Sequence, residues 1–438
     1  MKQNPRVQLF FGLIVLLLSG CEESDPGFNI DAPGNCTVAL EGDVYLASNL
    51  PSLRWPVKPH LDKAILMAAT QINGGGGIGF EGSTLGIISC DTQGDIAIGV
   101  ENVLALSELP LVAGIIGAAR SAVTMGSTPE DNGTCKMGSS KEIVSISPGS
   151  TNDQLGLIDD DDYCYRTCAS DSIQGRVQAS VAETMGCTKV LYISDVDDSY
   201  TTGLMNNFID ALSPTLEGVG KEFTMDTHTA DAVLAQLRSA DYNCLGSSLF
   251  TKDIAPILNR ISSEPDVQSL KIIVGDGAHS NDFLNALTRT TLDFLKNGNL
   301  QATKPGCTES THLFKSRYLA IYGNEDEEFD HSAYDATLLF ATAMSILDDP
   351  TDRTGIRDLL RDGKLQTGAA LDFQDWAALK AEAIKEGTVN YEGAAGAHDF
   401  EPDGDVDGNI WVGEIRDGHF TGSTTYKSCW GSDGNPLQ

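Results

Sequence analysis

The sequence has little positive charge. Its 438 residues include 29 lysines and arginines against 62 aspartates and glutamates, which gives a formal net charge of −33. Nucleic-acid binding rests on basic side chains that neutralise phosphates, so this balance argues against a nucleic-acid partner. The acidity is typical of a solvated surface, and with 41% hydrophobic residues the chain can bury the cores of roughly two or three domains.

The sequence also lacks the patterns that mark reactive or metal-binding sites. It has no Gly-x-Ser-x-Gly elbow and no His-Glu-x-x-His motif, and its seven histidines are scattered. Cys164 and Cys168 have no second pair to complete a zinc site. The glycines at 74–77 follow a helical pattern without Gly-Lys-Ser/Thr, and residues 403–408 carry the acid spacing of a calcium loop, but a turn is expected at both places. We therefore expect no enzyme activity, no metal and no cofactor.

Long apolar runs are missing too, apart from one at the start of the chain. It covers residues 9–18, about half of the roughly 20 that a membrane-spanning helix needs. Lys2 and Arg6 precede the run, and the Leu-Ser-Gly-Cys of residues 18–21 matches a lipobox. We expect residues 1–20 to be a lipoprotein signal peptide and Cys21 to carry lipid. An ordinary secretory leader with a chance cysteine is the alternative.

A signal peptide means that the chain is exported, and export in turn predicts its location and the oxidation of its cysteines. Residues 22–35 are rich in proline, glycine and acids, so residues 21–43 are expected to be the lipidated cysteine and a flexible tether. The protein would then be anchored in a bacterial cell envelope, facing the periplasm or the exterior. Besides Cys21 there are nine cysteines. An oxidising compartment predicts disulfides, and the odd number leaves at least one thiol free or paired with another chain.

From about residue 44, short β-type runs alternate with helical patterns, which predicts parallel sheets covered by helices. The first series has strands at 44–48, 85–90, 111–117 and 142–147. The second has strands at 189–194, 221–225, 242–250 and 270–275, between helices at 171–186, 199–213, 230–239 and 251–263. The tail has helices near 312–322, 332–348, 355–362 and 372–387, and strands near 397–400 and 408–420.

Short motifs follow one another in a distinctive order along this pattern. They are residues 71–78 (QINGGGGI), 90–95 (CDTQGD), 115–121 (IIGAARS), 146–151 (ISPGST), 165–167 (YRT), 195–203 (DVDDSYTTG), 333–336 (AYDA), 391–396 (YEGAAG) and 400–406 (FEPDGDV). Their order and spacing over residues 44–420 resemble the type I periplasmic binding proteins, in particular the leucine/isoleucine/valine-binding group.

The resemblance implies an α/β fold of two Rossmann-like lobes joined by three crossovers, with a ligand cleft between them. Crossovers near residues 160, 304 and 396 would assign 44–160 and 305–395 to lobe 1, and 161–304 and 396–438 to lobe 2. In that layout, Cys307 would pair with Cys429 and Cys90 with Cys135.

The resemblance also implies which residues hold the ligand. Open α/β sheets bind ligands beyond the carboxyl ends of their strands, where hydroxyls and backbone N–H groups can receive a carboxylate. Asp276 aligns with the acid that meets the ligand's ammonium in this family, and Tyr200 and Phe250 would line the other face. The expected ligand-binding residues are Ser121, Gly149, Ser150, Thr151, Tyr200, Phe250 and Asp276.

Several of these assignments have alternatives. Ser121 and Thr151 could cap helices, Asp276 could be an exposed turn acid, and Tyr200 could pack within a lobe.

Two further residues are possible ligand contacts, at places where the sequence departs from the family. Arg120 stands where a small or apolar residue is expected before Ser121, and could clamp a second carboxylate or point away. Trp55 could stack over the cleft mouth or be an ordinary core or surface tryptophan. The usual glycine after the first strand is replaced by residues 49–53 (NLPSL).

The expected function is that of a lipid-anchored solute-binding protein. It would capture an amino acid or a similar small polar ligand by hinge closure and present it to the permease of an ABC importer. The alternative is an envelope interaction or sensor lipoprotein that has the same fold but binds a protein partner.

Overall fold

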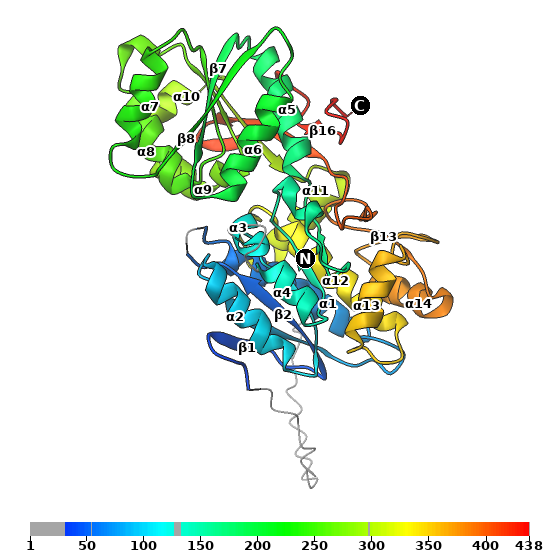
Figure 1. Ribbon diagram of the computed structural model, residues 1–438. Helices are drawn as coiled ribbons and strands as arrows, with labels where there is room; N and C mark the ends of the chain where they lie inside the picture. The colour runs from blue at the N-terminus through cyan, green and yellow to red at the C-terminus, as the bar shows by residue number, and fades with distance from the viewer. Residues whose placement is uncertain (1–30, 54, 127–132, 297, 438) are drawn as a thin grey trace, which may run out of the picture. The chain divides into compact units, whose positions relative to one another are not determined.

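The computed structural model describes residues 31–53, 55–126, 133–296 and 298–437 (Figure 1). The expected signal peptide, Cys21 and the expected tether up to residue 30 lie outside these residues. No helix in the described part of the chain is long and apolar enough to cross a membrane.

The first sheet has six strands in the order β1-β3-β2-β4-β5-β6. The strands are β1 (Cys36–Leu40), β2 (Val44–Leu50), β3 (Leu85–Asp91), β4 (Val112–Gly117), β5 (Ser145–Ser147) and β6 (Cys164–Arg166). Strands β2 to β6 pair in parallel, and β1 runs antiparallel to β3. All seven residues of β2 are buried, because helices cover both faces of a parallel sheet.

The helices around this sheet come from two distant stretches of sequence. The first stretch provides α1 (Lys58–Gly74), α2 (Ile96–Ser107), α3 (Ser121–Met125) and α4 (Thr134–Ser140); the second provides α11 (Glu309–Tyr322), α12 (Asp330–Ile346), α13 (Arg353–Arg361), α14 (Trp376–Glu386) and the small strands β12 (Ala370–Asp372) and β13 (Asn390–Glu392). The almost completely buried α12 packs against α1 and β4 in one hydrophobic core. We call this assembly lobe 1.

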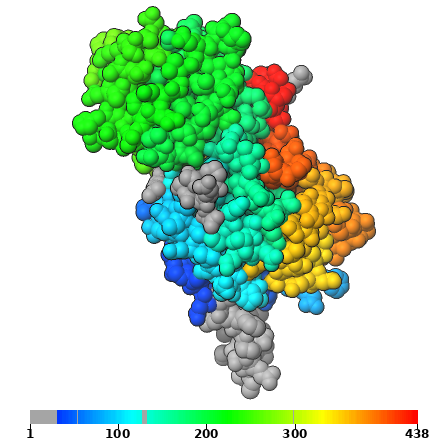
Figure 2. All heavy atoms as spheres, viewed as in Figure 1, coloured from blue at the N-terminus to red at the C-terminus, as the bar shows by residue number. Residues whose placement is uncertain are grey.

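Figure 2 shows at the surface how the two stretches of lobe 1 meet, where the gold residues of α13 adjoin residues near 160. Arg357 Nη1 donates to the carbonyl oxygen of Asp161 at 3.0 Å, and its guanidinium lies 4.9 Å from the ring centre of Tyr163. Residues almost 200 positions apart in the sequence thus hold lobe 1 together.

The second sheet, with its helices, forms lobe 2. Its strands are ordered β15-β14-β11-β10-β9-β7-β8, with β16 beside β14. They are β7 (Lys189–Asp195), β8 (Glu217–Phe223), β9 (Cys244–Ser247), β10 (Lys271–Val274), β11 (Leu300–Pro305), β14 (Ile410–Arg416), β15 (His419–Gly422) and β16 (Cys429–Trp430). The helices are α5 (Asp171–Thr184), α6 (Ser199–Asp210), α7 (Thr229–Arg238), α8 (Thr251–Ile261), α9 (Asn281–Ala286) and α10 (Arg289–Leu295). Separate hydrophobic clusters line the two faces of this sheet.

The chain passes between the two sheets three times: after β6, after β11 and between β13 and β14. The predicted α/β fold of two sheets with helices is therefore confirmed.

Some of the predicted strand positions and boundaries were wrong. Strand β6 completes the first sheet although it follows the boundary expected near 160, and β8 begins four residues before the expected strand at 221–225. Residues 397–400 contribute only two isolated bridges, at Ala397 and Phe400, and the expected strand at 408–420 is divided into β14 and β15.

The disulfides correct the predicted tether and one predicted pairing. Cys307–Cys429 is present as expected. Cys90, however, bonds to Cys36, since residues 36–40 are not tether but strand β1, which places Cys36 opposite Cys90. The remaining bonds are Cys135–Cys164 and Cys187–Cys244. The odd cysteine is Cys168, which is buried and free.

Candidate functional site

Each sheet has one point at which the order of its parallel strands reverses. In lobe 1, β2 lies between β3 and β4; in lobe 2, β7 lies between β8 and β9. Adjacent strands at such a point send their connections to opposite faces, which leaves a crevice outside their carboxyl ends. The candidate residues follow β2, β4 and β5 in lobe 1 and β7, β9 and β10 in lobe 2.

The segments after these strands meet around one small cavity. It is lined by Ala119 and by all of the candidate residues except Ser150 and Thr151. Its volume is about 10 Å³, which is enough for about one water molecule. The structure therefore brings most of the candidate set together, with its own side chains filling the space between them.

Asp276 is the acidic centre of the lobe 2 side. Its buried Oδ1 accepts hydrogen bonds from Gln174 Nε2 at 2.8 Å and from the hydroxyl of Tyr200 at 3.0 Å. The Tyr200 oxygen in turn accepts from the backbone N–H of Gly277 at 3.2 Å. Burial raises the pKa of Asp276 to about 6, while the hydrogen bonds from Gln174 and Tyr200 oppose the rise. A ligand ammonium at this carboxylate would stabilise its charged form.

Arg120 joins the two lobes. Its Nη2 forms an ion pair with Asp198 of lobe 2, and its Nη1 donates to the carbonyl oxygen of Gly94 at 2.8 Å. The guanidinium carbon lies 5.5 Å from the ring centre of Phe250, a cation–π distance. Both charged partners are buried, so water screens the pair little. Arg120 therefore lines the small cavity with its guanidinium already engaged by Asp198 and by the carbonyl oxygen of Gly94.

Aromatic rings form the wall next to Arg120. The indole of Trp55 lies 5.8 Å from the ring of Phe250 and 5.6 Å from that of Phe329, and Phe250 lies 5.3 Å from Tyr200. A Cβ added to Gly149 would stand 3.3 Å from the indole, so glycine gives Trp55 its close approach. These rings provide an apolar surface beside the charged groups, as ligand pockets commonly do.

Ser150 and Thr151 lie behind the cavity rather than in its wall. The Ser150 hydroxyl lies 2.6 Å from Thr124 Oγ1 and donates to the carbonyl oxygen of Ala118 at 3.1 Å. Fully buried Arg166 holds this loop, because its Nη1 lies 3.2, 3.0 and 2.8 Å from the carbonyl oxygens of residues 150, 151 and 152. Arg166 also forms an ion pair with Asp405.

A wider cavity opens beside the small one and shares Trp55, Phe250 and Asp276 with it. Its volume is about 220 Å³, and it extends between lobe 1 residues after β2 and lobe 2 residues after β10. Asp276 thus borders both spaces, so a molecule in the wider cavity can still reach its carboxylate.

The acids of residues 403–408 do not gather around one point. Asp405 pairs with Arg166, while Glu414, which stands at the twelfth position of the calcium-loop spacing, lies in β14 and pairs with Arg416. In the described residues, one group of potential metal ligands comes within 4.8 Å, namely Cys135, Asp160 and Cys164. Its two cysteines share a disulfide, so neither can offer a thiolate.

Sequence reasoning missed two residues of the site, Gln174 and Asp198. Gln174 lies on α5, a turn after the first crossover, and no local pattern connects it to Asp276. Asp198 lies within the motif at 195–203, where it caps α6 by accepting from Thr201 N at 3.2 Å. Its pairing with Arg120 is visible only when both lobes are in place.

Comparisons with known proteins match almost the whole described chain. A sequence profile of a family described as "Periplasmic binding protein" matches residues 56–419. A comparison with curated protein sequences finds no match.

Solved structures give the same architecture. The branched-chain amino-acid transporter substrate-binding protein LivJ of Streptococcus pneumoniae, in complex with isoleucine, superposes with a TM-score of 0.69 at 18% identity, over 87% of this chain and 99% of that one. The leucine-binding protein LivK of Thermotoga maritima gives 0.69 at 18% over 87% and 98%. A solute-binding protein of R. palustris in complex with benzoate gives 0.62 at 13% over 86% and 95%. At these identities the likeness concerns the fold.

Proposed function

The chain belongs to the periplasmic binding protein family, and we propose that it captures an amino acid or a similar small polar solute by closing its two lobes. Members of this family are solute-binding proteins and not enzymes. The predicted family is thereby confirmed, whereas the solute is our proposal.

The observation that carries the proposal is the meeting of the candidate residues at the two points of strand reversal. Asp276 offers a buried carboxylate for an ammonium group, and Ser121 and Gly149 stand opposite it on lobe 1. The aromatic pair Trp55 and Phe250 covers the apolar part of a bound molecule. Because the groups come from both lobes, a ligand that touches all of them favours the closed form.

We further propose that Cys21 carries lipid and that the receptor delivers its solute to the permease of an ABC importer. The lipobox at residues 18–21 supports the anchor. LivJ and LivK, which share the fold, are a substrate-binding protein of a branched-chain amino-acid transporter and a leucine-binding protein, respectively. In cells, a Cys21→Ser variant should move from the membrane fraction to the aqueous fraction, and an unchanged distribution would contradict the anchor.

Calorimetric titration of the full chain in detergent with single amino acids tests the binding proposal. We expect at least one of them to bind with one-to-one stoichiometry. In an Asp276→Asn variant, the loss of a charged hydrogen-bond partner is expected to weaken binding by about 10- to 100-fold. Asp210→Asn, on the exposed side of α6, is the matched control and should bind like the unchanged protein. Absence of binding at millimolar concentration for the whole set would refute the proposal.

A further inference from the structure

A third cavity, larger than the other two, adjoins the cavity beside Asp276. It measures about 420 Å³ and is lined by both lobes: by α11 and residues 325–328 from lobe 1, and by β14, β15 and residues after β10 from lobe 2. His279, Ser280, Glu327 and Glu328 border this space and the 220 Å³ cavity alike, so the two are neighbours along one cleft. Volumes of this size are typical of ligand pockets.

Lys304 presents an unpaired cation to this space. It is 9% exposed, and in the part of the chain that the structure describes its ammonium has no hydrogen bond or ion pair. It stands opposite Trp411 in the antiparallel pairing of β11 and β14, with Nζ 5.9 Å from the centre of the indole. Burial and the nearby Lys315 lower the pKa of Lys304, because a buried charge without a partner is costly, so an anion bound beside the ammonium would stabilise its charged form.

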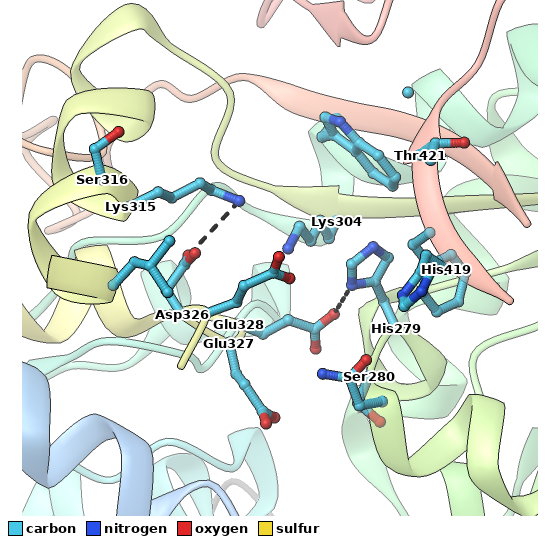
Figure 3. Close-up of a pocket in the computed structure, with 16 residues that line it drawn as sticks. His279, Ser280, Lys304, Lys315, Ser316, Asp326, Glu327, Glu328, His419 and Thr421 are labelled. Carbon is cyan, nitrogen blue, oxygen red and sulfur yellow. Dashed lines mark ion pairs between the residues drawn. The ribbon is translucent and has the colours of Figure 1, made fainter. Parts of the chain in front are cut away.

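The acids near Lys304 are poorly placed to neutralise it. Figure 3 shows Lys304 entering the space between Glu328 and His279 on one side and Lys315 and Asp326 on the other. Glu328 is engaged by His279 Nδ1 at 2.7 Å, and Asp326 by Lys315 Nζ at 3.6 Å. Burial raises the pKa of Glu328 well above its usual range, which weakens this carboxyl as a counter-ion.

Lys304 is close enough to Asp276 to affect the charge of that carboxyl. The ammonium of Lys304 contributes to lowering the pKa of Asp276, against the larger effect of burial. An anion site and a cation site therefore stand in neighbouring cavities. Of the two cavities that Asp276 borders, the one that Arg120 also lines measures only about 10 Å³, and the other measures about 220 Å³.

We propose that the solute is an acidic, amino-acid-like molecule whose ammonium lies at Asp276 and whose second anionic group, a carboxylate at the far end, lies at Lys304. This inference rests on the proposed function, because it names the class of solute for the same cleft. Residues of both lobes line the cavity around the far end of the solute, so its binding there favours the closed arrangement of the lobes. The cation–π surface of Trp411 and the ring of Phe420 cover the carbon chain before the second carboxylate.

The test compares acids with their own amides, which have the same shape without the negative charge. The probes are aspartate, glutamate and α-aminoadipate, each beside its side-chain amide, titrated calorimetrically into the full chain in detergent. We expect at least one acid to bind ten-fold or more tightly than its amide. Lys304→Met should remove this preference, because the side-chain volume is kept and the unpaired charge is lost.

Lys271→Met is the matched control. Lys271 begins the neighbouring strand β10, at the opposite end of the sheet, where its Nζ donates to Asn299 Oδ1 at 2.7 Å. This variant should keep the preference for the acid. Equal affinity for acids and amides in the unchanged protein, or a preference that survives Lys304→Met, would overturn the inference while the proposed amino-acid binding stands. If neither the acids, the amides nor any other amino acid binds, both proposals fall.

Discussion

Arg166 gives the sharpest test of how the site is held in shape. This fully buried side chain forms an ion pair with Asp405 and binds three successive carbonyl oxygens of the loop at 150–152. Methionine at this position keeps much of the volume and removes every one of these interactions. Arg166→Met therefore leaves the carbonyl groups unpaired behind the cavity and the Asp405 carboxylate without its cation.

The expected loss of stability follows from the burial of these groups. Removing one partner of a buried ion pair typically costs about 3–5 kcal/mol, because the other charge stays behind uncompensated. Each buried carbonyl that loses its donor adds about 1 kcal/mol or more. Asp405 is partly exposed and can regain water, which offsets part of the cost. We expect the free energy of unfolding to fall by about 4 kcal/mol.

Equilibrium unfolding in urea, followed by tryptophan fluorescence, measures this change. The matched control is Arg176→Met, since Arg176 lies on α5 in an exposed contact, its Nη2 donating to Ser432 O at 2.5 Å. That variant should change the free energy of unfolding by no more than about 0.5 kcal/mol. A loss below about 1 kcal/mol for Arg166→Met would refute the reasoning that this arginine holds the loop.

Three further predictions concern the cleft and the crosslinks. Burial raises the pKa of Asp276 from 3.8 to about 6, so its contribution to stability is full below pH 3.8 and is lost as the pH rises through 6. The shift corresponds to about 3 kcal/mol. The free energy of unfolding of the unchanged protein, minus that of Asp276→Asn, should therefore fall by about this amount as the pH rises from 3.8 past 6. A difference that does not change with pH would contradict the prediction. Arg120→Ala removes the ion pair with Asp198 and should enlarge the radius of gyration of the ligand-free protein in solution scattering; an unchanged radius would mean that the pair does not hold the lobes together. Replacing Cys307 and Cys429 by serine opens a connection of 122 residues, which should cost about 4 kcal/mol in urea unfolding, whereas a cost below about 1 kcal/mol would argue against the crosslink.

The alternation of strands and helices could be predicted because parallel strands are buried on both faces. Strand β7, for example, has a central apolar run, VLYI, which stands out locally. Strand β8 begins four residues before the position predicted for it, for the opposite reason. It lies at the edge of its sheet with most of its side chains at least partly exposed, so its hydrophobic pattern is weak.

Strand β1 could not be predicted from its own residues. It is five residues long, follows a segment rich in proline and glycine, and acquires its structure by pairing with β3, some fifty positions later. The expected lobe layout had no strand at Cys36, and the pairing of Cys90 with Cys135 that it implied was wrong. Register between distant strands decides such crosslinks, and no local pattern contains it.

The residues of the site likewise differ in whether local sequence could predict them. Residues that directly follow a strand, such as Ser121 and Asp276, could be predicted, because the carboxyl ends of parallel strands meet at one edge. Whether a side chain faces the cleft depends on the turn that carries it, and the Ser150 hydroxyl instead bonds to the carbonyl oxygen of Ala118. Gln174 reaches the site from a helix, and its role follows only from packing across the crossover.

The residue that shapes the cleft most is the one that departs from the family pattern. A small side chain before Ser121 would leave room beside Asp276, but Arg120 occupies that room and brings a charge that must be neutralised. Asp198 neutralises it from the opposite lobe, so the same substitution narrows the inner cavity and adds a tie between the lobes. The free volume then lies farther along the cleft, toward Lys304, whose ammonium has no hydrogen bond or ion pair among the described residues. A solute that reaches both Asp276 and Lys304 would occupy the volume that Arg120 leaves free. The comparison of acids with their amides distinguishes such a solute from a simple α-amino acid.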